Sequence, residues 1–161
     1  FRKILEPDRN NQAALYAKAR NKRQCLWIYG KTGRGKSKLA QVILQDYLRD
    51  LRHVSMVAAV ELFTIDRFYE NVISSQVLVI DDIHVHKWTE FSVPLLHNCL
   101  EKRGEMHLQT IVTCEWDIET FGESMLAGTR GICGQSTLAR LDACGKRIDL
   151  HLEGENLRRA T

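Results

Sequence analysis

Two adjacent carboxylates end a short apolar run in the segment VLVIDDIHVH, residues 77–86. Val77 to Ile80 are apolar and mostly β-branched, which predicts a buried strand. Asp81 and Asp82 follow this strand directly, and two neighbouring negative charges repel each other unless a cation lies close to them. The spacing therefore predicts a cation-binding position at the end of the strand.

The segment GKTGRGKS, residues 30–37, has the spacing of a phosphate-binding loop. Gly30, Gly35, Lys36 and Ser37 occupy the fixed positions of the pattern G-x-x-x-x-G-K-[ST]. The segment follows a predicted strand and opens a predicted helix, which is the context that the motif requires. Backbone N–H groups of the loop and the positive end of the helix would then point at phosphate oxygens.

Together the two segments predict a site for ATP with Mg²⁺. Lys36 is expected to reach the β- and γ-phosphates, and the Ser37 hydroxyl to bind Mg²⁺. Asp81 would bind the same ion directly or through water, and Asp82 would orient or deprotonate the attacking water. The residues expected to bind the nucleotide are Gly30, Lys31, Thr32, Gly33, Arg34, Gly35, Lys36, Ser37 and Lys38.

The composition is that of an ordinary globular domain. The 161 residues are 44% apolar and 27% charged, and the net charge of +3 permits a nucleic-acid partner without requiring one. We expect no membrane span, because no apolar run approaches about 18 residues, and we expect no signal peptide. The five cysteines form no C-x-x-C pair, which favours free thiols in a reducing compartment and a cytoplasmic protein.

The apolar pattern predicts strands that alternate with helices. Strands are expected at 25–29, 54–60, 77–80, 109–114 and 147–152, helices at 36–51, 61–73, within 89–103 and near 135–143, and a glycine-rich loop at 122–134. This alternation predicts an α/β fold with a mainly parallel sheet. We expect a linker helix in residues 1–24 and an ATPase core in residues 25–161.

Four segments occur in an order that resembles the ATPase core of AAA+ helicase loaders: GKTGRGKS, VLVIDD, TIVTCEWD and STLARLDACGKRIDLHLEGENLR. The resemblance is to DnaC/DnaI-type replicative helicase loaders and the related IstB-type transposition ATPases. It implies a P-loop NTPase fold with a parallel five-stranded sheet between helices and no helical lid. It also implies that the TIVTC strand lies between the P-loop strand and the VLVIDD strand.

The same resemblance implies partners and a further catalytic residue. Such loaders form a ring or spiral with ATP at each interface, and a neighbouring subunit donates an arginine to the site. Arg140 matches this position, and Arg130 is the rival. The implied partners are a replicative helicase and single-stranded DNA, and an isolated subunit is expected to hydrolyse ATP slowly.

One position departs from the family pattern. The strand at 109–114 is usually followed by a polar Asn that senses the γ-phosphate, whereas this chain has Glu115. A carboxylate about 4 Å from a phosphate charge costs roughly 4 kcal/mol at an effective dielectric of about 20. We therefore expect Glu115 to point away, to act through the metal or a water, or to stay protonated, with Thr113 as the alternative sensor.

Several functions remain open. The chain could be a helicase loader, an IstB-like ATPase that coats duplex DNA, or a nucleotide-binding adaptor with little turnover. A viral superfamily 3 helicase also has a P-loop and paired acids, but its motifs fit the C-terminal half of this sequence poorly. Residues 84–88, HVHKW, have three possible roles. His84 and His86 could bind a metal, or His86, Lys87 and Trp88 could contact nucleic acid by stacking on a base and binding a phosphate. Alternatively, Trp88 simply packs against the protein.

Overall fold

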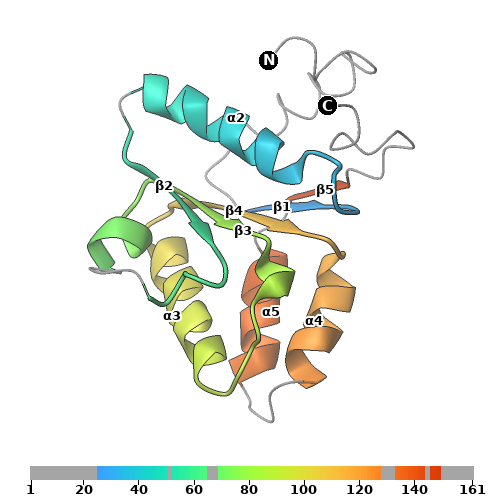
Figure 1. Cartoon of the computed structure of the whole chain (residues 1–161). Coiled ribbons are helices and arrows are strands. Elements are labelled where there is room, and N and C mark those ends of the chain that lie inside the picture. Colours follow the sequence, from blue (N-terminus) through green and yellow to red (C-terminus); the bar gives the residue numbers. More distant parts are fainter. Residues whose placement is uncertain (1–24, 51, 65–68, 128–132, 144–145, 150–161) are drawn as a thin grey trace.

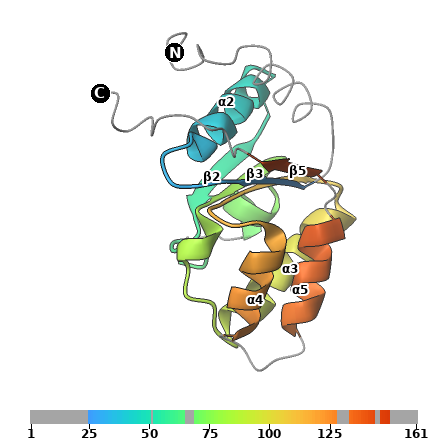
Figure 2. The ribbon, with the colours of Figure 1, turned by 90° about the vertical axis from the view of Figure 1, so that its right-hand side faces the viewer.

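The computed structural model describes residues 25–50, 52–64, 69–127, 133–143 and 146–149. In this part of the chain, five strands form one sheet between two layers of helices (Figure 1). Helix α2 (Lys36–Arg49) covers one face, and α3 (Ser92–Glu105), α4 (Ile118–Ala127) and α5 (Cys133–Ala143) cover the other, as Figure 2 shows from the side. The predicted α/β architecture with a parallel sheet is confirmed.

The strands follow the order β2-β3-β4-β1-β5, and all pairs are parallel. Their bounds are β1 Leu26–Tyr29, β2 Val54–Ala58, β3 Val77–Asp81, β4 Gln109–Cys114 and β5 Lys146–Asp149. Strand β4 lies between β1 and β3, as predicted for the TIVTC strand. The carboxyl ends of β1 and β3 therefore meet the same edge of the sheet, outside which ligands bind in open α/β folds.

Alternation along the strands divides the core between the two faces of the sheet. In β3, Val77 and Val79 pack in the cluster beneath α2. Leu78 and Ile80 point the other way, into the cluster built with α3, α4 and α5. All four side chains are buried because helices cover both faces, and this explains why the strand has a continuous apolar sequence rather than an alternating one.

Helix α4 occupies part of the segment predicted as a glycine-rich loop. A Cβ atom at Gly122 would lie 2.8 Å from Cδ1 of Leu138 in α5. This glycine therefore allows close packing of two helices, and it does not end a helix. The loop prediction is wrong for residues 122–127 and 133–134, which are helical, while residues 128–132 lie outside the described part of the chain.

The helix predicted at 61–73 is wrong for residues 61–64. Residues 61–64 form tight turns, residues 65–68 lie outside the described ranges, and only η2, the π-helix Tyr69–Ile73, is helical. The carbonyls of Val72 and Ile73 accept hydrogen bonds from Arg103 at 3.0 and 2.9 Å. Arg103 thus satisfies carbonyls in the last turn of η2, which have no partner within that helix.

Arg103 has the largest fully buried side chain among the described residues, with 1% exposed. Its Nη1 donates to three carbonyls between residues 72 and 75, its Nε to the Thr110 hydroxyl at 2.9 Å, and its Nη2 to the Gln109 carbonyl. Burial lowers the pKa of Arg103 to about 10, so the guanidinium stays charged at neutral pH. This side chain ties η2 and the start of β4 to α3.

Arg103→Met should lower the free energy of unfolding by about 3 kcal/mol or more, because buried carbonyls lose their donors. Arg49→Met is the matched control, since Arg49 also ends a helix but pairs with Asp46 on the exposed surface at 2.9 Å. Exposed pairs contribute only about 0.2–1 kcal/mol. Urea unfolding measures both variants, and equal losses would contradict the structural role of Arg103.

The predicted linker helix in residues 1–24 and the end of the last predicted strand, residues 150–152, lie outside the described residues. No helix in the described ranges is long and apolar enough to cross a membrane.

Candidate functional site

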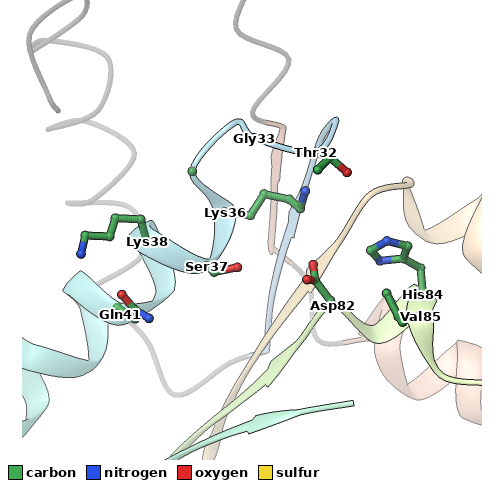
Figure 3. A pocket seen from close by; sticks show the side chains of 10 residues that line it. Thr32, Gly33, Lys36, Ser37, Lys38, Gln41, Asp82, His84 and Val85 are labelled. Carbon is green, nitrogen blue, oxygen red and sulfur yellow. The ribbon is translucent and has the colours of Figure 1, made fainter. Parts of the chain in front are cut away.

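An open cavity of about 450 Å³ lies outside the carboxyl ends of β1 and β3 (Figure 3). One wall is the loop before α2 with the first turns of that helix, and the other is the segment that follows β3. The lining residues are Thr32, Gly33, Gly35, Lys36, Ser37, Lys38, Gln41, Asp82, His84 and Val85. The structure thus brings together the two segments that the sequence predicts to share a site.

The loop depends on glycines at its turns. Gly30, Gly33 and Gly35 have φ values of 144°, 84° and 84°, which side-chain-bearing residues rarely adopt. Gly35 directly precedes α2, and the first N–H groups of a helix have no partner within the helix. These N–H groups border the cavity, where they favour an anion such as phosphate.

Lys36 is buried, with 6% of its surface exposed. Its Nζ donates to the carbonyls of Gly30 at 2.8 Å and Lys31 at 3.2 Å. The loop therefore holds the ammonium group beside the cavity. Phosphate oxygens would form stronger, charge-assisted bonds with this group than the neutral carbonyls do.

Asp82 turns the chain out of β3. Its backbone is left-handed, with φ 53° and ψ 51°, a conformation that Asp tolerates better than most residues. The Asp82 N–H donates to the Thr113 hydroxyl at 2.8 Å, which stabilises the turn. Figure 3 shows the Asp82 carboxylate on the wall opposite Ser37, with the two side chains pointing toward one another.

Thr113 lies beneath the cavity and is fully buried. Its hydroxyl donates to Asp81 Oδ1 at 2.5 Å and accepts the Asp82 N–H. The Thr113 hydroxyl therefore holds both the Asp81 side chain and the Asp82 backbone in place. Neither Thr113 nor Asp81 lines the cavity, and the sensing role proposed for Thr113 stays a prediction.

Glu115 follows β4 and contacts His84 in two ways. Its N–H donates to His84 Nδ1 at 3.3 Å, and its Oε2 lies 3.5 Å from His84 Nε2. His84 lines the cavity, whereas Glu115 does not. Glu115, at the expected sensor position, therefore contacts the cavity only indirectly, by way of His84.

Arg140 lies in the last turn of α5 and away from the cavity. Its Nη2 contacts Glu101 Oε1 of α3 at 2.5 Å, and both side chains are partly exposed. Strand β5, which follows α5, starts beside Leu26 at the amino end of β1, whereas the P-loop leaves the carboxyl end of that strand. Arg140 is therefore not placed to reach the cavity of its own subunit, and Arg130 lies outside the described residues.

Three cavity residues were not predicted to belong to the nucleotide site: Gln41, His84 and Val85. Gln41 lies four residues after Ser37 on a helix, so the two share a face, and this spacing was available in the sequence. His84 and Val85 belong to η3 (Ile83–Val85), a 3-10 turn for which the sequence shows no periodic signal. Their side chains enter the site only because of the left-handed turn at Asp82.

Trp88 packs in the interior and does not form a surface for stacking on bases. It is 8% exposed, and its Nε1 donates to the Ile83 carbonyl at 3.2 Å. Its ring contacts those of His86, Phe63 and Phe121, with centroids 4.5, 6.4 and 6.1 Å away. Simple packing of Trp88 is confirmed.

The side chains at the cavity have the chemistry that Mg²⁺ prefers. No group of three or more His, Cys, Asp or Glu side chains that could hold a metal ion occurs among the described residues. Mg²⁺ is usually held by one or two carboxylates, with phosphates and water completing its shell. The oxygens of Ser37 and Asp82, which line the cavity, fit this mode of binding for a metal that arrives with a nucleotide, while the metal-binding role of Asp81, which does not line the cavity, stays a prediction.

Comparison with known proteins gives a family and a fold. The family described as RNA helicase matches residues 26–108, and no curated protein sequence matches the chain. A crystal structure of DnaI has a TM-score of 0.77 at 20% identity and covers 96% of this chain and 87% of its own. The DnaC helicase loader has a TM-score of 0.69 at 18% identity, with 86% and 88% covered.

A third similar structure belongs to a protein that is longer than this chain. The replication initiator DnaA bound to AMPPCP and single-stranded DNA has a TM-score of 0.70 at 16% identity, and the match covers 94% of this chain but 48% of DnaA. At such identities the similarity establishes the fold, which is the P-loop NTPase fold of the DnaC/DnaI type. Because the family match spans more than half of the 161 residues, the chain belongs to the RNA helicase family and carries its P-loop on the AAA+ fold that DnaI and DnaC share.

Proposed function

We propose that this protein is an AAA+ ATPase that acts in DNA replication as a helicase loader, binding single-stranded DNA and a replicative helicase. The observation that carries the proposal is the cavity in which the P-loop faces Asp82, on the fold of DnaI and the DnaC helicase loader. The DnaA structure bound to AMPPCP and single-stranded DNA supports a role for nucleotide and DNA.

The residues of the cavity would divide the work of ATP hydrolysis. The loop N–H groups and Lys36 bind the phosphates and neutralise their charge. Ser37 and Asp81 would hold Mg²⁺, which would supply further positive charge at the phosphates. Asp82 orients a water molecule and accepts its proton. Most of the acceleration would come from such positioning and electrostatic stabilisation.

A neighbouring subunit would complete the site. Lys36 would bind the phosphates, and the two acids would bind the metal and act as the base. Arg140 lies toward the opposite edge of the sheet. In a ring or spiral, the same arginine would face the nucleotide of the next subunit, since such assemblies repeat one head-to-tail contact. The lack of a helical lid stays a prediction of the family resemblance, and a cytoplasmic location stays a prediction from the cysteines.

A second candidate is that the chain itself separates strands. The observation that favours it is the match of the RNA helicase family over residues 26–108. An adaptor with little turnover is favoured by Glu115 at the position where the family pattern has Asn. An IstB-like ATPase would share the same cavity but act on duplex DNA.

Single-stranded DNA should raise the rate of ATP hydrolysis more than duplex DNA or single-stranded RNA does. The measurement is phosphate release with each nucleic acid at fixed salt, because binding to a phosphate backbone depends steeply on ionic strength. Copurification with a replicative helicase would support the loader.

Other outcomes would favour other functions. Displacement of a strand from a partial duplex without a second protein would identify a helicase. Stimulation by duplex DNA alone would favour the IstB-like function. Tight ATP binding with no turnover under any condition would favour the adaptor.

A further inference from the structure

Glu115 would place a negative charge near the γ-phosphate if its side chain entered the cavity as the usual Asn does. The structure shows a different arrangement, in which His84 lines the cavity and Glu115, which contacts His84, does not. His84 comes from η3, after β3, and Glu115 from the end of β4, and the two are linked by the N–H bond to Nδ1 and by the 3.5 Å contact at Nε2.

The first of these contacts determines where the histidine carries its hydrogen. Nδ1 accepts the Glu115 N–H, so the hydrogen of a neutral His84 ring belongs on Nε2. Nε2 is therefore a donor whether the ring is neutral or charged. Its distance of 3.5 Å from Glu115 Oε2 is longer than a good hydrogen bond, so the Nε2 donor is not committed to this carboxylate and remains available to a better acceptor.

The ring is held in place from a second side. The Trp116 ring packs edge-on against His84, with centroids 5.4 Å apart. The Trp116 carbonyl accepts a hydrogen bond from Trp27 Nε1 of β1 at 3.2 Å. The segment after β4 is thus anchored to the strand that carries the P-loop, and the His84 donor is preorganised relative to Lys36. Figure 3 shows its ring beside Asp82, facing the cavity.

We propose that His84 donates a hydrogen bond from Nε2 to the γ-phosphate of bound ATP, and that Glu115 is the positioning residue that orients this histidine. The proposal rests on the proposed ATPase function and adds to it the residue that recognises the third phosphate. The orienting contact is the Glu115 backbone N–H, which fixes the tautomer and the direction of the ring through Nδ1. A donor aimed at developing negative charge typically contributes about 10²–10³ in rate.

The assignment predicts a specific pattern of binding. His84→Phe keeps a ring against Trp116 but removes the donor. It should weaken a non-hydrolysable ATP analogue by about tenfold or more, since a bond to a charged group is lost. Affinity for ADP should stay nearly unchanged, because ADP lacks the third phosphate. The rate of hydrolysis at saturating ATP should fall by about 10².

Three further variants make the test sharp. His84→Gln restores an N–H donor and should recover part of the discrimination between ATP and ADP. Glu115→Gln keeps the backbone bond to Nδ1 and should retain most of it. His86→Phe is the matched control, because His86 packs on Trp88 and does not line the cavity. It should bind and hydrolyse ATP like the parent, and thermal melting without nucleotide checks that each variant folds.

The outcomes separate this proposal from the ATPase function on which it rests. A parent chain that binds neither ATP nor ADP with Mg²⁺ overturns both. A parent that binds both, together with a folded His84→Phe variant that loses ATP and ADP affinity equally or keeps both, overturns only the role of His84. Selective loss of ATP affinity in His84→Phe, with recovery in His84→Gln, supports it.

Discussion

Lys36→Ala should reduce the affinity for ATP by at least about 100-fold, because charge-assisted contacts to the β- and γ-phosphates are lost, and the affinity for ADP by about tenfold or more, because only the contact to the β-phosphate is lost. The ammonium group is buried beside the cavity and held by the carbonyls of Gly30 and Lys31. It is therefore already in place before a nucleotide binds, and little binding energy is spent on ordering it. Titration with a fluorescent nucleotide and Mg²⁺ measures the effect.

Two controls accompany this variant. Lys87→Ala removes an exposed lysine that does not line the cavity, so its affinity for nucleotide should match that of the parent. Lys36→Arg keeps the charge but replaces a compact ammonium with a planar fork, and it should bind less well than the parent. A Lys36→Ala chain that binds ATP like the parent would show that the nucleotide does not use this cavity.

The parts of the cavity whose position the sequence predicts are those determined by neighbouring residues. Gly30, Gly35, Lys36 and Ser37 act through one loop, whose conformation follows from its own glycines and from the helix that starts at Lys36. The strand before Asp81 is recognisable because four consecutive apolar residues are buried on both faces of the sheet. The fold and the position of the cavity could be predicted because these two motifs are recognisable from a few consecutive residues.

The parts that sequence reasoning missed depend on contacts between distant segments. Gly122 belongs to a glycine-rich segment, which is typical of a loop, yet it lies in helix α4. A glycine is needed there because a side chain would collide with Leu138 of α5. Arg103 has the signal of a surface charge at a helix end, yet it is buried and binds carbonyls about thirty residues away. His84 enters the site only through the turn that Thr113 stabilises from β4.

Arg140→Ala should lower ATP turnover in the assembled protein by about 10³ or more and leave nucleotide affinity nearly intact, as expected for an arginine supplied in trans. The residue pairs with Glu101 on the partly exposed surface between α3 and α5. Loss of that pair costs the fold about 1 kcal/mol at most. A change in turnover therefore reports on the neighbouring site rather than on stability, and Arg49→Ala is the matched control on α2.

Dependence on concentration gives the first check of a role in trans. An isolated subunit should bind ATP and turn it over slowly, and the specific activity of the parent should rise with protein concentration or with DNA that promotes assembly. The Arg140→Ala chain should show no such rise. Full activity of this variant at every concentration would show that Arg140 is an ordinary surface residue and that Arg130 or no arginine completes the site.

Mixing two inactive variants gives the second check. Arg140→Ala keeps its own P-loop, and Lys36→Ala keeps its arginine, so an interface between them pairs a working nucleotide site with a working arginine. In a random equimolar assembly about a quarter of the interfaces have this combination, because each contact is head-to-tail. Asp82→Asn is a second mixing partner, since it retains Lys36 for binding nucleotide and lacks only the proposed base. Recovery of activity in both mixtures requires that Arg140 acts on its neighbour, whereas mixtures as inactive as their components would place the arginine and the P-loop in the same subunit's reaction.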